Sequence, residues 1–262
     1  MPRLLTGRGM RLLGLLCLLS LPYKGVYAEP WQVLTEENPP WSFTQAGQLQ
    51  GFAPALIEAM TASLGDSAQL RALPWARAFK QAQQQPGALL LITIRTPSRE
   101  RLFKWVGPVV KVNVGFYTLK GQRVTINDDA DLAKLPGIGS IRAWFSYSEM
   151  RAMGLDNLVP VRQADQLLQL LEHGRVPVVA ADDFIIHASS NVGIRHDDLE
   201  LIYPFRQVYG YIAINAQTPD EDVQRLQQAL DGLKASGEFS RLYRQWLPAP
   251  SSEALASLGA RP

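Results

Sequence analysis

Short apolar runs alternate along this chain with longer segments in which apolar residues return every three or four positions. The runs have the length of buried strands and are bounded by polar residues, glycine or proline, at 31–35, 88–93, 111–119, 137–141, 176–181 and 208–215. Helical spacing is found in the segments at 51–60, 74–84, 167–171, 219–236 and 239–246. Because strands and helices alternate, the sequence predicts an α/β fold.

Polar residues and glycines mark where several of these helices begin and end. The segments 146–149 and 218–221 are of the capping-box type, with a hydroxyl residue three positions before a glutamate. Gly174 and Gly237 follow the last apolar positions of two helices, where a left-handed backbone conformation is common. We therefore expect helices to begin at the two boxes and to end at the two glycines.

The first 28 residues have the pattern of a secretory signal. Arginines at positions 3, 8 and 11 precede an apolar stretch at 12–21 that is too short to span a bilayer. The small residues Val26 and Ala28 then suit cleavage after Ala28. The sequence therefore predicts an exported protein.

Removal of this leader changes the charge of the chain. The sequence has 26 Lys and Arg residues against 24 Asp and Glu, and four of the basic residues lie in the leader. The mature chain would keep 22 basic and 24 acidic residues, a net charge of −2, which does not favour nucleic-acid binding. The one cysteine, Cys17, is also in the leader, so thiol catalysis, disulfides and zinc-thiolate sites are excluded from the mature chain.

Three arginines, Arg95, Arg99 and Arg101, lie in a short polar segment directly after the apolar run at 88–93. A guanidinium group is always charged and presents a rigid fork of donors, so an arginine at the end of a strand suits the capture of a carboxylate. A solvated basic loop accounts for the same residues. The local sequence leaves both interpretations open.

Four motifs follow one another along the mature chain. They are Asn-Pro-Pro-Trp-Ser-Phe at 38–43 with Gly-Phe at 51–52, Thr-Pro-Ser-Arg at 96–99 with Trp105 and Pro108, Gly-Arg at 174–175 followed by Asp182, and a C-terminal helix pair that ends near Trp246. In this order and spacing they resemble the family 3 solute-binding proteins, the periplasmic amino-acid-binding components of ABC importers. The resemblance covers nearly all of the mature chain.

This resemblance implies a two-lobed periplasmic-binding-protein fold of type II, in which each lobe is a mixed sheet flanked by helices. Two crossover strands, near 111–117 and 205–210, would join the lobes, and the ligand would lie in the cleft between them. The chain would divide into a signal peptide (1–28), a discontinuous lobe 1 (29–113 and 208–248), lobe 2 (114–207) and a disordered tail (249–262).

The resemblance also implies that Arg99 holds the carboxylate of the ligand, because the family's arginine element matches at 96–99. A bidentate pair between guanidinium and carboxylate provides both energy and orientation. Arg95 precedes the same turn and is an alternative clamp, and Arg77 is a third. The competing interpretations are a structural ion pair for Arg99 and a solvated helix face for Arg77.

Aromatic and acidic candidates complete the expected cleft. Trp41 and Trp75 fall where the family has aromatic walls, which stack on a ligand or cover an ammonium group, although core packing explains both tryptophans as well. Asp182 falls where the family uses an acid to hold the ligand's amine, and Glu36 is a second candidate for that amine. The alternative for Asp182 is a cap on the following helix.

Lobe 2 would add Arg142, Trp144 and Phe145, which lie just before a predicted helix N-terminus, a favourable place for an anion. The family usually has glycine and hydroxyl residues here, and small or hydroxyl residues where this chain has Ile92 and Ile94. A larger or more aromatic carboxylate therefore suits this chain at least as well as a standard amino acid.

We therefore expect a monomeric periplasmic protein that binds a small carboxylate-bearing solute by closing two lobes around it. Its partner would be an inner-membrane ABC permease or a sensor, and we expect no catalytic residue, metal or other cofactor. One alternative is an enzyme on the same fold, similar to a cyclohexadienyl or prephenate dehydratase, with Glu36, Glu37 or Asp182 as acid or base. The other is a solute sensor that is not coupled to transport.

Overall fold

The computed structural model describes residues 29–142, 144–188, 193–247 and 258 of the 262-residue chain. The predicted signal peptide lies outside these residues, and so does the expected disordered tail except for Leu258. Only 2% of the surface of Leu258 is exposed, and this side chain packs in the main core.

Within the described residues, eight strands form one mixed sheet in the order β4-β1-β5-β10-β6-β9-β7-β8. Their bounds are β1 (Trp31–Thr35), β4 (Ala68–Ala72), β5 (Ala88–Ile94), β6 (Phe103–Leu119), β7 (Ile138–Ile141), β8 (Leu158–Val161), β9 (Val178–Asp182) and β10 (Leu199–Asn215). A separate antiparallel hairpin pairs β2 (Phe43–Gln45) with β3 (Gln48–Gln50). The predicted α/β class is therefore confirmed.

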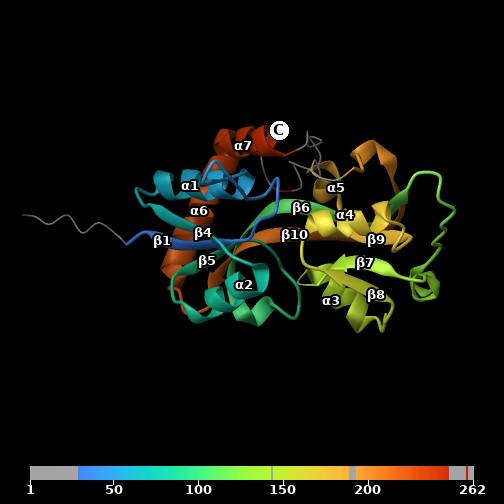
Figure 1. Cartoon of the computed structure of the whole chain (residues 1–262). Helices are drawn as coiled ribbons and strands as arrows, with labels where there is room; N and C mark the ends of the chain where they lie inside the picture. The colour runs from blue at the N-terminus through green and yellow to red at the C-terminus, as the bar shows by residue number, and fades with distance from the viewer. Residues whose placement is uncertain (1–28, 143, 189–192, 248–257, 259–262) are drawn as a thin grey trace, which may run out of the picture.

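Two strands of 17 residues each, β6 and β10, cross the molecule from one half to the other. They pair antiparallel from Leu199 opposite Leu119 to Asn215 opposite Phe103. Figure 1 shows them between a group with β1, β4 and β5 and a second group with β7, β8 and β9. The expected crossovers are thus confirmed, but each strand begins earlier than its apolar run because the partner strand satisfies its backbone there.

Helices cover both faces of the sheet (Figure 1). In the first half, α1, α6 and α7 pack against one another, whereas α2 packs on β1 and β5. The helices are α1 (Phe52–Ser63), α2 (Trp75–Gln84), α3 (Phe145–Ala152), α4 (Ala164–Glu172), α5 (Asp183–Ala188), α6 (Asp220–Ser236) and α7 (Glu238–Trp246), with short 3₁₀ turns at Glu100–Leu102, Asp129–Lys134 and His196–Asp198. Gly174 (φ 63°) and Gly237 (φ 85°) follow α4 and α6, which confirms the predicted helix ends.

The two predicted capping boxes are wrong. Helix α3 begins one residue before its box, so Ser146 is buried inside the first turn instead of capping it. Helix α6 begins at Asp220 after Pro219, and the buried hydroxyl of Thr218 has no hydrogen-bond partner among the described residues. In both cases the residue directly before the helix has extended backbone angles and carries no side-chain cap.

The main core runs through both halves of the molecule. In the first half, the ring of Phe52 at the start of α1 packs against those of Phe239 and Tyr243 of α7. Phe116 of the crossing strand β6 belongs to the same core. A second cluster contains the predicted leucine stripe of α4, and a third lies between α2 and the sheet. None of the helices in the described ranges is both long and apolar enough to cross a membrane.

Candidate functional site

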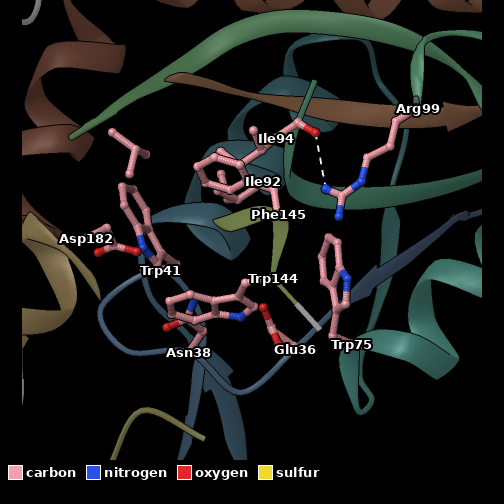
Figure 2. Close-up of a pocket in the computed structure, with 11 residues that line it drawn as sticks. Glu36, Asn38, Trp41, Trp75, Ile92, Ile94, Arg99, Trp144, Phe145 and Asp182 are labelled. Atoms are coloured by element: carbon pink, nitrogen blue, oxygen red, sulfur yellow. Dashed lines mark hydrogen bonds between the residues drawn. The ribbon is translucent and has the colours of Figure 1, made fainter. Parts of the chain in front are cut away.

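A small pocket with a cavity volume of about 60 Å³ lies where the two halves of the molecule meet (Figure 2). The first half contributes the loop after β1, the start of α2 and the end of β5, and the second half contributes the start of α3 and the end of β9. The lining residues are Glu36, Asn38, Trp41, Trp75, Ile92, Ile94, Arg99, Val112, Trp144, Phe145 and Asp182.

The loop after β1 is held in place by its own short hydrogen bonds. The Ser42 hydroxyl donates to the backbone carbonyl of Glu36 at 2.6 Å and lies 2.7 Å from the hydroxyl of Thr35. The backbone N–H of Asn38 donates to the carbonyl of Ser42 at 2.7 Å, and the N–H of Trp41 donates to the carbonyl of Asn38 at 2.8 Å. These bonds fix the backbone positions from which three lining side chains project.

Arg99 provides the positive charge of the pocket. One of its guanidinium nitrogens, Nη1, donates to the backbone carbonyl of Ile94 at 3.2 Å (Figure 2). The guanidinium carbon lies 5.7 Å from the ring centre of Trp75 and 5.3 Å from that of Phe79. No acidic side chain of the described chain pairs with Arg99, and burial lowers its pKa. Its other donors are therefore available to an anion in the pocket.

A β-bulge shapes the same wall. Ile92 has φ of 49°, a left-handed conformation that is rare for a β-branched residue, and the register of β5 against β10 shifts at this point. Two residues of β5, Leu91 and Ile92, lie opposite Ile212 of β10. Such strain persists where the surrounding structure enforces it. Here the strained residue, Ile92, and its neighbour Ile94 both contribute apolar side chains to the wall of the pocket.

Two carboxyl groups give the pocket an acidic character. Glu36 directly follows β1, and Asp182 is the last residue of β9 and is 8% exposed. Burial raises the pKa of Glu36 to about 7; a hydrogen bond from the Trp144 side chain opposes this rise, and the negative charge of Asp182 adds to it. The Glu36 carboxyl group therefore changes its charge near neutral pH.

Aromatic rings from both halves meet at this site. Trp41 is 3% exposed, and its ring centre lies 4.4 Å from the ring centre of Phe184 in α5. Trp144, just before α3, reaches Glu36 of the first half. The pocket is thus bounded by direct contacts between the two halves as well as by the strands that join them.

Seven of the ten residues proposed from the sequence line this pocket: Glu36, Trp41, Trp75, Arg99, Trp144, Phe145 and Asp182. The other three are elsewhere. Arg95 makes two hydrogen bonds of 2.8 and 2.6 Å to Glu100, and its guanidinium lies over the rings of Trp105 and Tyr211. Arg77, on α2, and Arg142, after β7, are exposed and do not line the pocket.

Four lining residues were not selected from the sequence. Asn38 is the first residue of the motif at 38–43, in which only Trp41 was predicted to line the cleft. Ile92 and Ile94 alternate along a strand that ends near Arg99, which is a signal that they share one face. Val112 lies in the middle of β6, and only the crossing of this strand brings it to the pocket.

In the described ranges, His, Cys, Asp and Glu side chains form no group of three that is placed to hold a metal ion. The pocket itself contains one guanidinium group, two carboxyl groups, one amide and a set of apolar and aromatic walls. This arrangement is suited to a solute that carries charges of both signs.

Comparison with known proteins gives one matching family and a relative of similar length. The profile of the family described as bacterial extracellular solute-binding proteins, family 3, matches residues 32–249. A probable histidine-binding protein of Neisseria gonorrhoeae is 22% identical over 220 residues, which are 81% of this chain and 80% of that protein.

Two solved structures show the same fold. The arginine-, lysine- and histidine-binding protein ArtJ of Geobacillus stearothermophilus has a TM-score of 0.72 at 19% identity, with 87% of this chain and 100% of that chain covered. A histidine kinase sensor domain with similarity to periplasmic binding proteins has a TM-score of 0.75 at 18% identity, with coverage of 86% and 99%. The expected two-lobed type II fold is thus confirmed.

Proposed function

Because this chain belongs to the bacterial extracellular solute-binding proteins of family 3, we propose that it captures an amino acid or a related carboxylate-bearing solute in the pocket between its halves. The observation that carries this proposal is the arrangement of charges in the pocket. Arg99 lies on one side without an acidic partner among the described residues, and Glu36 and Asp182 lie elsewhere on the wall. A zwitterion matches both sides at once.

In this proposal Arg99 binds the carboxylate of the solute, and Asp182 binds its amino group with Glu36 as a second acid. Trp41, Trp75, Trp144 and Phe145 form the walls. Rings of this size favour a solute with a flat or apolar part, because such a part stacks on indole and phenyl surfaces. The names of the relatives add histidine, arginine and lysine to the solutes to be tested first.

The proposal extends to the use of the two halves. Residues 29–113 and 208–248 form lobe 1, and residues 114–207 form lobe 2. A solute that contacts both lobes favours their closure by its difference in affinity for the closed and open forms. The closed, exported monomer then delivers the solute to an inner-membrane ABC permease.

The test is calorimetry of the purified protein, without residues 1–28, against L-histidine, L-arginine, L-lysine and L-phenylalanine. For the solute that binds, Arg99→Ala should raise the Kd about 100-fold, because a charge-assisted bidentate pair is lost. Arg95→Ala is the matched control and should leave the Kd within about twofold, since Arg95 pairs with Glu100 outside the pocket. Equal effects of the two substitutions would contradict the role of Arg99.

An enzyme of the dehydratase type is a second candidate, and the Glu36 carboxyl group favours it. Its pKa of about 7 suits a general acid at neutral pH. Incubation with prephenate would then yield an aromatic keto acid, seen by its ultraviolet absorbance, and Glu36→Gln would abolish the product. Absence of any product from the native protein would remove this candidate and leave solute binding.

A further inference from the structure

The side chain of Asn38 contains a buried carbonyl oxygen that has no hydrogen-bond partner in the described part of the chain. The Oδ1 atom is shielded from solvent, and no described residue donates to it. The backbone of Asn38, by contrast, is fully engaged, since its N–H binds the carbonyl of Ser42 and its C=O accepts from Trp41 and Ser42. The loop therefore holds Asn38 firmly in the wall of the pocket and leaves its side chain unused.

Asn157 shows what a structural asparagine looks like in the same molecule. Its Oδ1 is also buried and unpartnered, but its Nδ2 donates to the carbonyls of Leu132 and Leu135, each at 2.8 Å. Asn157 therefore ties two backbone segments together, and it does not line the pocket. Among the described residues no such bond involves the side chain of Asn38, and an unpaired buried carbonyl is unfavourable.

The surroundings of Asn38 indicate which kind of group would satisfy it. Figure 2 shows Arg99 and Trp75 on one side of the pocket and Asn38, Trp41 and Asp182 on the other. Asn38 thus adds an acceptor group on the side of the pocket that contains Asp182, while the carboxyl group of Glu36 lies between Trp144 and Trp75. A protonated amine has up to three N–H donors and is attracted by these acids, whereas a carboxylate has none.

We propose that Asn38 is a further ligand-binding residue, whose Oδ1 accepts a hydrogen bond from the amino group of the bound solute beside Asp182 and Glu36. This inference rests on the proposed function and makes it more specific. The pocket then selects solutes whose nitrogen keeps its hydrogens, and it discriminates against analogues that lack the amino group, because those leave Oδ1 unpaired.

Calorimetry with paired probes tests this role. The probes are L-arginine and L-histidine, each compared with the analogue that lacks only the α-amino group, 5-guanidinopentanoate and 3-(imidazol-4-yl)propanoate. Asn38→Leu should weaken binding of the amino acid at least about tenfold and change binding of its analogue less than about twofold. The Tm of the ligand-free variant should stay equal or rise, because the buried unpaired oxygen is removed.

Asn157→Leu is the matched control, and it should lower the Tm without changing either affinity. Two results would overturn the role of Asn38: an equal loss of affinity for the amino acid and its analogue, or unchanged affinity of Asn38→Leu for the amino acid, which together with a fall in Tm indicates a structural or water-bound asparagine. If the native protein binds neither these four probes nor L-lysine and L-phenylalanine, the proposed function fails instead, independently of any variant.

Discussion

At the scale of single residues, the buried carboxyl group of Glu36 makes the stability of this protein depend on pH near neutrality. Its carboxyl group lines the pocket, and burial raises its pKa from 4.5 to about 7, against the effect of the Trp144 hydrogen bond. The protonated form is therefore favoured in the folded protein relative to the unfolded chain. A positively charged group that enters the pocket reverses this preference, because it stabilises the carboxylate.

The ligand-free protein should accordingly lose stability as the pH rises through this range. Between about pH 4.5 and 7 the folded state binds more protons at Glu36 than the unfolded state, so the free energy of unfolding falls, by up to about 3 kcal/mol, and levels off above pH 7. Glu36→Gln should remove this contribution and raise the Tm at pH 8, as measured by thermal denaturation from pH 5 to 8. Glu37→Gln is the control, because Glu37 binds Thr44 at the surface and lines no part of the pocket. A slope that survives in Glu36→Gln would refute this origin.

At the scale of elements, the junction between the loop and α1 carries the first wall of the pocket. The N–H groups of Phe52 and Ala53, at the start of α1, donate to the carbonyls of Pro40 and Trp41 at 3.3 and 2.8 Å. Gly51 allows this approach because it has φ of 122°, and a Cβ here would lie 2.6 Å from the carbonyl oxygen of Trp41. The family's Gly-Phe motif thus has a physical cause in this chain.

Gly51→Ala should therefore destabilise the protein by more than about 2 kcal/mol and weaken solute binding, because the loop must move to relieve the clash. Gly232→Ala is the matched control: Gly232 is exposed inside α6, and nothing lies within 4 Å of the added Cβ. This second substitution should stabilise the protein by about 0.5–1 kcal/mol. Urea denaturation measures both, and a neutral Gly51→Ala would contradict the proposed clash.

For the whole molecule, the main feature is one sheet that passes through both halves. The long strands β6 and β10 join the halves, and side chains also meet between them, Trp41 with Phe184 and Glu36 with Trp144. Contacts of this second kind exist only while the halves are close together. In the closure proposed above, they would add to the free energy that comes from contacts with the solute.

Phe184→Ala should shift the molecule toward open forms. Loss of an aromatic pair worth about 0.5–1.5 kcal/mol raises the Kd for the bound solute about 2- to 12-fold. Small-angle scattering of the ligand-free variant should show a larger radius of gyration than that of the native protein. The control is Phe43→Ala, since the Phe43–Trp246 ring pair, with centres 6.2 Å apart, lies within one half. Identical affinity and scattering for Phe184→Ala and the native protein would exclude a role of this contact in closure.

Much of the fold could be predicted because its signals are local. Apolar runs mark β1 and β5, leucine spacing marks α4, and Gly237 ends α6, since each depends on residues a few positions apart. The edge strands β4 and β8 and the hairpin β2–β3 escaped prediction. Residues 68–72 alternate in burial only because they pair with β1, so the cause lies more than 30 positions away in the chain.

The site was predicted in kind but not in detail. The types of residue that the pocket needs, an arginine after a buried strand, acids at strand ends and tryptophans in loops, can be read from the chain itself. Which of two nearby arginines faces the pocket was decided only by folding: Glu100 pairs with Arg95 outside, and the carbonyl of Ile94 with the rings of Trp75 and Phe79 directs Arg99 inside. The direction of a side chain at the end of a strand depends on its neighbours in space, and these are set by the packing of the two halves.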